Sequence, residues 1–79
     1  MRVQVKLFGI FCDFFPPGAG GPALWLDFPE EAKLGDIFSR LKIPENLPRE
    51  IIWNGRIGEE DQVLHEGDVI AIFSPITGG

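Results

Sequence analysis

Hydrophobic and polar residues alternate at the start of the chain. Over residues 2–8 every second residue is apolar, which is the period-two pattern of a half-buried β-strand. The segment 9–22, GIFCDFFPPGAGGP, then carries adjacent prolines and several glycines, which end regular structure and form a connection. A second strand pattern follows over 23–28. The two strands predict an N-terminal hairpin.

The next apolar residues have helical spacing, at Leu34, Ile37, Phe38 and Leu41. They predict a helix over about 34–42, which Pro44 ends. A longer helix that starts near Pro29 would place Gly35 in its interior, at a cost of about 1 kcal/mol relative to Ala. The shorter helix is therefore preferred, although its N-cap residue, Lys33, is a poor one.

The second half of the chain predicts three further strands. EIIWNGRIG places apolar residues on both sides of Asn54-Gly55, the strongest short-range signal of a type I′ hairpin turn. The last strand follows Gly67-Asp68 and is apolar on both faces. Strand, strand, helix, strand, short strand, strand is the order of an α+β fold, with one mixed sheet packed on one helix.

Such a sheet has one face without a helix, and several apolar residues are expected there. They are Phe8, Ile52 and Phe73, with Val69 as a further candidate. A contiguous exposed apolar patch usually marks a partner surface. Two interpretations stay open: a docking surface for a partner, or a surface that the Phe-rich segment 9–22 covers.

Composition narrows the classes of function. The 79 residues favour one domain over 1–79. Seven Lys and Arg against twelve Asp and Glu, a net charge of −5, lack the basic footprint of a nucleic-acid-binding protein. We expect no nucleic-acid partner. The N-terminus has no secretory signal pattern, and no apolar run approaches a membrane span, so the expected compartment is the cytoplasm.

Catalytic and metal-binding patterns are missing from the sequence. The single cysteine, Cys12, is either a reactive thiol or a small apolar residue, and the second interpretation is preferred because no basic residue is near in sequence. The single histidine, His65, is expected in a solvated loop. No metal site, phosphate-binding loop or nucleophile–base pair is recognised, so the chain is not expected to be an enzyme.

Four segments together carry a resemblance that covers nearly the whole chain: VKLFG, LGDIFSRL, NGR and LHEGDVIAIFSPITGG. The sequence resembles the MoaD and ThiS family of sulfur carriers, which are the small subunit of molybdopterin synthase and the sulfur carrier of thiazole biosynthesis. The resemblance implies a ubiquitin-like β-grasp fold with 74–79 as an exposed, flexible Gly-Gly tail. Two features depart from the family pattern, Lys33 at the helix start and the Phe-, Pro- and Gly-rich 9–22 segment.

The resemblance also implies a site at the C-terminus. A ubiquitin-activating-type adenylyltransferase would use ATP to adenylate the Gly79 carboxylate, and a sulfur donor would convert it to a thiocarboxylate. Gly78 lacks Cβ, which suits a narrow channel. Pro75 would stiffen the tail and Ile76 would anchor it in an apolar pocket. No cofactor is expected on the chain itself.

Other interpretations remain open at this stage. The chain could be a ubiquitin-like modifier joined to lysines through Gly79, or a β-grasp interaction module with an idle tail. Within the carrier interpretation, the partner would be the large subunit of a molybdopterin or a thiazole synthase, and the aromatic AIFSP segment leans toward molybdopterin. Asp68 either shapes the turn before the last strand, the preferred interpretation, or contacts a partner.

Overall fold

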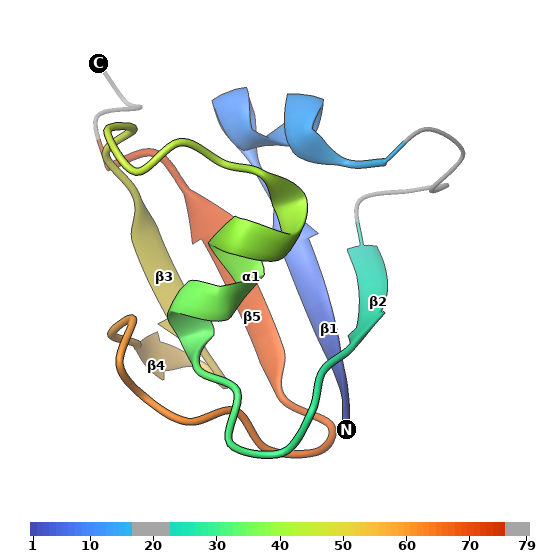
Figure 1. The fold of residues 1–79 in the computed structure, drawn as a ribbon. Coiled ribbons are helices and arrows are strands. Elements are labelled where there is room, and N and C mark those ends of the chain that lie inside the picture. Colours follow the sequence, from blue (N-terminus) through green and yellow to red (C-terminus); the bar gives the residue numbers. More distant parts are fainter. Residues whose placement is uncertain (17–22, 76–79) are drawn as a thin grey trace.

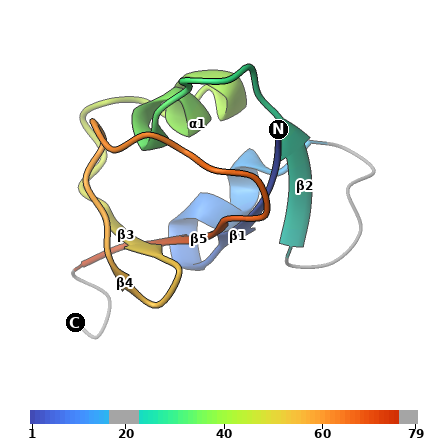
Figure 2. The same cartoon turned by 90° about the horizontal axis from the view of Figure 1, so that it is seen from below.

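The fold is a five-stranded sheet with one α-helix packed on one face (Figures 1 and 2). A computed structural model describes residues 1–16 and 23–75. The elements in chain order are β1 (Arg2–Leu7), the 3-10 helix η1 (Gly9–Phe14), β2 (Ala23–Asp27), α1 (Leu34–Leu41), β3 (Glu50–Trp53), β4 (Arg56–Ile57) and β5 (Val69–Phe73). The predicted order of strands and helix is confirmed.

The strand order in the sheet is β2-β1-β5-β3-β4, so the last strand is central. β1 pairs with β2 and β3 pairs with β4 as antiparallel hairpins, whereas β1 and β5 are parallel. β5 is antiparallel to β3 on its other side. The sheet is therefore mixed, as the sequence predicted, and the first and last strands are neighbours although they are farthest apart in sequence.

The core lies between the sheet and α1. Alternate residues of the central strands point into it and are fully buried, namely Val3, Val5, Leu7, Ile70 and Ile72. They face the apolar stripe of α1, whose four buried residues are the ones that carried the helical spacing: Leu34, Ile37, Phe38 and Leu41. Burial of these side chains from both elements is the main favourable contribution to folding.

The start of α1 explains how a lysine can be the N-cap residue. The Lys33 side chain has no acceptor atom and cannot cap the helix, but the backbone N–H of Lys33 donates to Asp36 Oδ2 at 2.8 Å. The next N–H groups, of Leu34 and Gly35, donate to the carbonyls of Gln62 and Glu60, both at 2.9 Å. A neighbouring loop thus satisfies the helix terminus. The helix ends one residue earlier than predicted, because Lys42 adopts a left-handed conformation (φ 61°).

The segment after β1 corrects one expectation. Residues 9–22 were predicted to lack regular structure, yet Gly9–Phe14 forms η1. Phe11 is fully buried in the core, and Phe14 and Phe15 pack against the core from its edge. The first half of the Phe-rich segment therefore contributes to the core. Phe8 remains 43% exposed, and residues 17–22 lie outside the described part of the chain.

Glycine and asparagine set the turn of the β3–β4 hairpin. Asn54 and Gly55 both have positive φ, 52° and 87°, as a type I′ turn requires. Shortly after β4, Gly58 is buried where a Cβ atom would lie 2.9 Å from both Leu34 Cδ1 and Trp53 Cβ. Only glycine fits this point of contact between hairpin and helix.

Candidate functional site

The face of the sheet opposite α1, called here the open face, carries the predicted partner residues. Ile52 and Phe73 are half-buried on it, and Phe8 is exposed. The N–H of Phe8 donates to the carbonyl of Ile72 at 3.0 Å, which extends the β1–β5 ladder by one residue and places Phe8 beside Phe73. Ile52 pairs with Ala71 of the same central strand. The structure thus brings the three residues together around β5.

Two open-face residues were not singled out from the sequence. Trp25 of β2 is 53% exposed and pairs with Gln4, while Ile57 of β4 is still more exposed and pairs with Ile52. The alternation in ALWLD contained the signal for Trp25, because the residue next to two inward leucines must point outward. Both edge strands therefore carry an exposed apolar side chain on the open face, and polar Gln4 of β1 lies beside Trp25.

β5 carries the C-terminal segment away from the middle of the sheet. β1 and β3 flank this strand, so its backbone is held on both sides. Ser74, which the sequence analysis places in the exposed tail, is only 8% exposed, because it directly continues the central strand. Pro75 is exposed, so the exposed segment starts at Pro75 and not at Ser74. Ile76, Gly78 and Gly79 lie outside the described residues.

At the other end of β5, Asp68 forms a hydrogen-bonded centre. Its Oδ2 accepts from Trp53 Nε1 at 2.9 Å and from the N–H of His65 at 2.7 Å. Its Oδ1 accepts from Asn54 Nδ2 at 2.9 Å. The residue is 6% exposed. A buried carboxylate with three donors is the expected way to stabilise a charge away from water.

The same contacts explain the acidity of Asp68. Burial alone raises the pKa of a carboxyl group, but the hydrogen bonds from Trp53, Asn54 and the His65 N–H oppose it, with a smaller contribution from the charge of His65. The pKa of Asp68 is lowered below its ordinary value of 3.8, so the hydrogen bonds outweigh burial. Asp68 is ionised at neutral pH.

Asn54 connects this centre to the start of β5. Its Oδ1 accepts from the N–H of Val69 at 2.8 Å, and its own N–H donates to the Val69 carbonyl at 2.9 Å. The β3–β4 turn is therefore fixed to the last strand through Asp68 and Asn54. These contacts support the interpretation that Asp68 shapes the turn, and they use the carboxylate within the chain.

The remaining candidate groups offer little reactive chemistry. Cys12 is exposed, and its Sγ donates to the Leu7 carbonyl at 3.2 Å. His65 is exposed and stacks on Trp53 at 6.4 Å between ring centroids. Among residues 1–16 and 23–75, no group of three His, Cys, Asp or Glu side chains could hold a metal ion, and no helix is long and apolar enough to cross a membrane.

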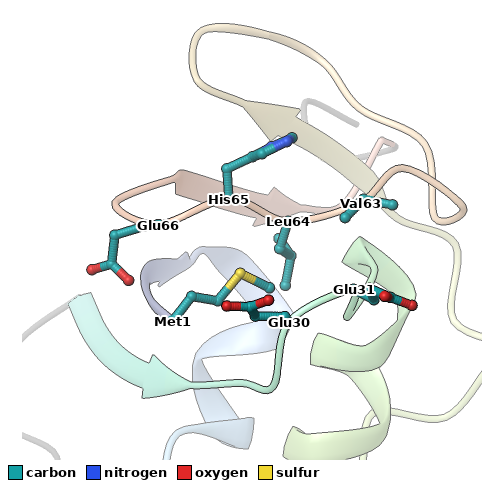
Figure 3. Close-up of a pocket in the computed structure, with 7 residues that line it drawn as sticks. All are labelled: Met1, Glu30, Glu31, Val63, Leu64, His65 and Glu66. Carbon is teal, nitrogen blue, oxygen red and sulfur yellow. The ribbon is translucent and has the colours of Figure 1, made fainter.

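A hollow of about 420 Å³ lies at the opposite end of the fold from Pro75 (Figure 3). Its lining combines three apolar residues with four polar ones: Met1, Val63 and Leu64, and Glu30, Glu31, His65 and Glu66. The hollow lies near the beginning of β1 and β5, whereas Pro75 follows the end of β5 (Figure 1). The hollow is therefore not part of the candidate site at the tail.

Comparisons with known proteins agree with this arrangement. The model of the ThiS family matches residues 24–79. No curated protein matches the sequence. Among solved structures, a protein described as molybdopterin converting factor subunit 1 from Pyrococcus furiosus is 27% identical with a TM-score of 0.73, over 95% of this chain and 98% of that one.

Two structures of lower sequence identity have the same fold. The modifier protein SAMP1 of Haloferax volcanii is 20% identical with a TM-score of 0.76, and all of both chains is covered. In a complex of subunits 1 and 2 of the molybdopterin-converting factor of Helicobacter pylori, the similar chain is 22% identical with a TM-score of 0.63, again over both full lengths. These likenesses identify the ubiquitin-like β-grasp fold.

Proposed function

The chain belongs to the ThiS family, and we propose that it is a sulfur carrier whose Gly79 carboxylate becomes a thiocarboxylate. The observation that carries the proposal is the extent of the family match, which runs from the second strand through Pro75 to Gly79. The proteins of this family are small carriers without catalytic activity of their own. Carrier or ubiquitin-like modifier is the class of function that the family supports.

The proposed chemistry needs activation, because a carboxylate is a poor electrophile. The Gly79 carboxylate attacks the α-phosphate of ATP, and pyrophosphate leaves. Hydrosulfide, or a donor that delivers it, then attacks the acyl carbon, and AMP leaves with the bonding electron pair. ATP and the catalytic groups belong to a partner adenylyltransferase, so the carrier itself needs no bound cofactor. We expect these partners to act in the cytoplasm.

The described structure supports a docking role for the open face. Phe8, Ile52 and Phe73 surround the end of the strand that leads to Pro75. A partner that covers these apolar side chains would gain free energy from their burial and hold the tail at a fixed starting point. Because β5 is already held on both sides, only the tail has to become ordered when it enters a channel, which limits the loss of conformational entropy on binding.

Of the two pathways, we propose molybdopterin synthesis. The 27% identity with the Pyrococcus furiosus protein supports this branch, and the Helicobacter pylori complex illustrates a subunit 1 bound to a subunit 2. The partner of this chain would then be the large subunit of a molybdopterin synthase, which performs the chemistry on the pterin precursor. Co-purification of that subunit, and not of a thiazole synthase, is the expected result.

Intact-mass measurement tests the proposal. Incubation with the cognate adenylyltransferase, ATP and sulfide should add the mass difference between sulfur and oxygen, and deletion of Gly79 should abolish the shift. Phe73→Glu should slow loading about tenfold or more, because it places a charge at the centre of the docking surface. Val63→Glu is the matched control, since Val63 is 40% exposed and lines the hollow at the opposite end of the fold from Pro75. Absence of a mass shift with a verified cognate enzyme would count against the carrier function.

A modifier would use the same activation step but a different acceptor. The chain would then appear in cell extracts joined to lysines through Gly79, and digestion would leave Gly-Gly remnants on those lysines. Loading with sulfur but no such remnants would support the carrier over the modifier.

A further inference from the structure

β2 is an edge strand of the sheet. Among the described strands it pairs only with β1. Exposed edge strands are usually guarded by lysines, prolines or bulges, because their free N–H and C=O groups can pair with another chain. The strand sequence ALWLD contains none of these guards, and its one charge is at the last residue, Asp27.

The hydrogen bonds on β1 identify which β2 groups are free. The Gln4 N–H points to β5, where it donates to the Asp68 carbonyl at 2.9 Å. The backbone N–H and C=O groups of its neighbours Val3 and Val5 therefore point to β2. Their partners in register, Leu26 and Leu24, therefore use their own backbone groups toward β1. The N–H and C=O groups of Trp25 and Asp27 must then point away from the sheet. Arg40 Nη2, which donates to the Asp27 carbonyl at 2.8 Å from outside, agrees with this direction.

The side chains of the edge are apolar on both faces. Leu24 and Leu26 are half-buried on the α1 side and pack against the core from its border. Trp25 is exposed on the open face. A strand added to this edge would cover apolar surface above and below the sheet as well as pair the free backbone groups.

We infer that a second copy of this chain pairs antiparallel with β2, with Trp25 at the two-fold axis. In this register the outward-pointing Trp25 faces Trp25 of the second copy and exchanges both backbone hydrogen bonds with it. Leu24 then faces Leu26, and Ala23 faces Asp27. Every residue thus meets a compatible partner, as an isologous interface requires. Asp27 lies opposite a small neutral residue, and its carbonyl can accept from both Arg40 and the added strand.

The dimer is weak and depends on salt. A pair of five-residue strands buries less than the roughly 1,000 Å² of a stable interface, so association is transient. Each copy carries a net charge of −5, so the copies repel at low ionic strength and added salt screens that repulsion. The association constant therefore rises with salt.

Sedimentation velocity from micromolar to millimolar protein, at low and high salt, measures this association. Amide chemical shifts of the ¹⁵N-labelled chain locate it, and concentration-dependent changes are expected at residues 23–27. Trp25→Pro removes the outward donor together with the indole and breaks no hydrogen bond to β1, because the N–H of residue 25 is not used toward β1. It should weaken association at least about tenfold. Circular dichroism verifies that this variant folds.

Two further variants make the result specific. Trp25→Thr keeps the N–H and favours a strand but removes the indole, so it should weaken association less than Trp25→Pro. Ile57→Ser removes an exposed apolar side chain from β4, at the opposite edge of the sheet, and should leave association unchanged. A chain that stays monomeric at millimolar concentration, a dimer that Trp25→Pro leaves intact, or shift changes centred on Phe73 would each overturn the inference.

Discussion

Replacement of Asp68 by Asn keeps the shape of the side chain but removes its charge and one acceptor. In either orientation of the new amide, its NH₂ group faces a donor. If the amide oxygen takes the place of Oδ2, the NH₂ group meets Asn54 Nδ2; if it takes the place of Oδ1, the NH₂ group meets both Trp53 Nε1 and the His65 N–H. Rotation of the Asn54 amide does not help, because its oxygen already accepts from Val69.

The first orientation sets the magnitude, because it loses only one hydrogen bond to a charged group. Such a bond contributes about 1.5–3 kcal/mol. Asn54 is exposed and can turn its freed donor to water, so we expect a loss near the lower end, about 2 kcal/mol. In a domain of this size about 2 kcal/mol corresponds to a decrease of about 8–16 °C in melting temperature.

The loss should depend on pH in a defined direction. The pKa of Asp68 in the folded chain lies below its ordinary value of 3.8, so the ionised carboxylate stabilises the fold at every pH above that value. This stabilisation is lost as the pH falls through the lower pKa of the folded state. The difference between the wild type and Asp68→Asn should therefore be full at neutral pH and shrink in acid.

Urea unfolding at neutral pH and in acid measures both quantities. Asp61→Asn is the control, because Asp61 is exposed and makes no hydrogen bond through its side chain to a described residue; its effect should stay within about 0.5 kcal/mol. A loss for Asp68→Asn as small as that of the control, or one that is the same in acid as at neutral pH, would refute the reasoning.

Two further substitutions test how the core is built. Phe11→Ala should cost about 3–5 kcal/mol by urea unfolding, because η1 buries this ring completely, whereas Ile10→Ala on the same helix should cost under about 1 kcal/mol; equal effects would mean that η1 is not part of the core. Gly58→Ala should cost about 1–3 kcal/mol, because the new methyl group collides with Leu34 and Trp53; an unchanged denaturation midpoint would contradict the close packing there.

The strands and the helix could be predicted because their patterns are local. Alternation in 2–8, helical spacing from Leu34 to Leu41 and the Asn54-Gly55 turn each depend on neighbours within a few residues. The same alternation placed Ile52 and Phe73 opposite the core. Strand order was compatible with the pattern, but the central position of β5 became clear only from the pairing.

The features that could not be predicted depend on contacts between distant segments. The N–H groups at the start of α1 find acceptors in residues 60 and 62, which no capping rule for adjacent residues can identify. Phe11 lies among prolines and glycines, so its burial could not be separated from that of the other aromatic residues nearby. The hydrogen bond between Asp68 and Trp53 joins residues 15 positions apart, and the residues around either one do not indicate the other as its partner.

The parallel contact between β1 and β5 also has a mechanical consequence. The chain begins at one end of this pair, and Pro75 follows the other end (Figure 1). A force that pulls these two ends apart acts along the strands, so it loads all of their mutual hydrogen bonds at once instead of opening them one after another. Withdrawal of the C-terminal segment from a tight channel would thus strain the sheet in its most resistant direction.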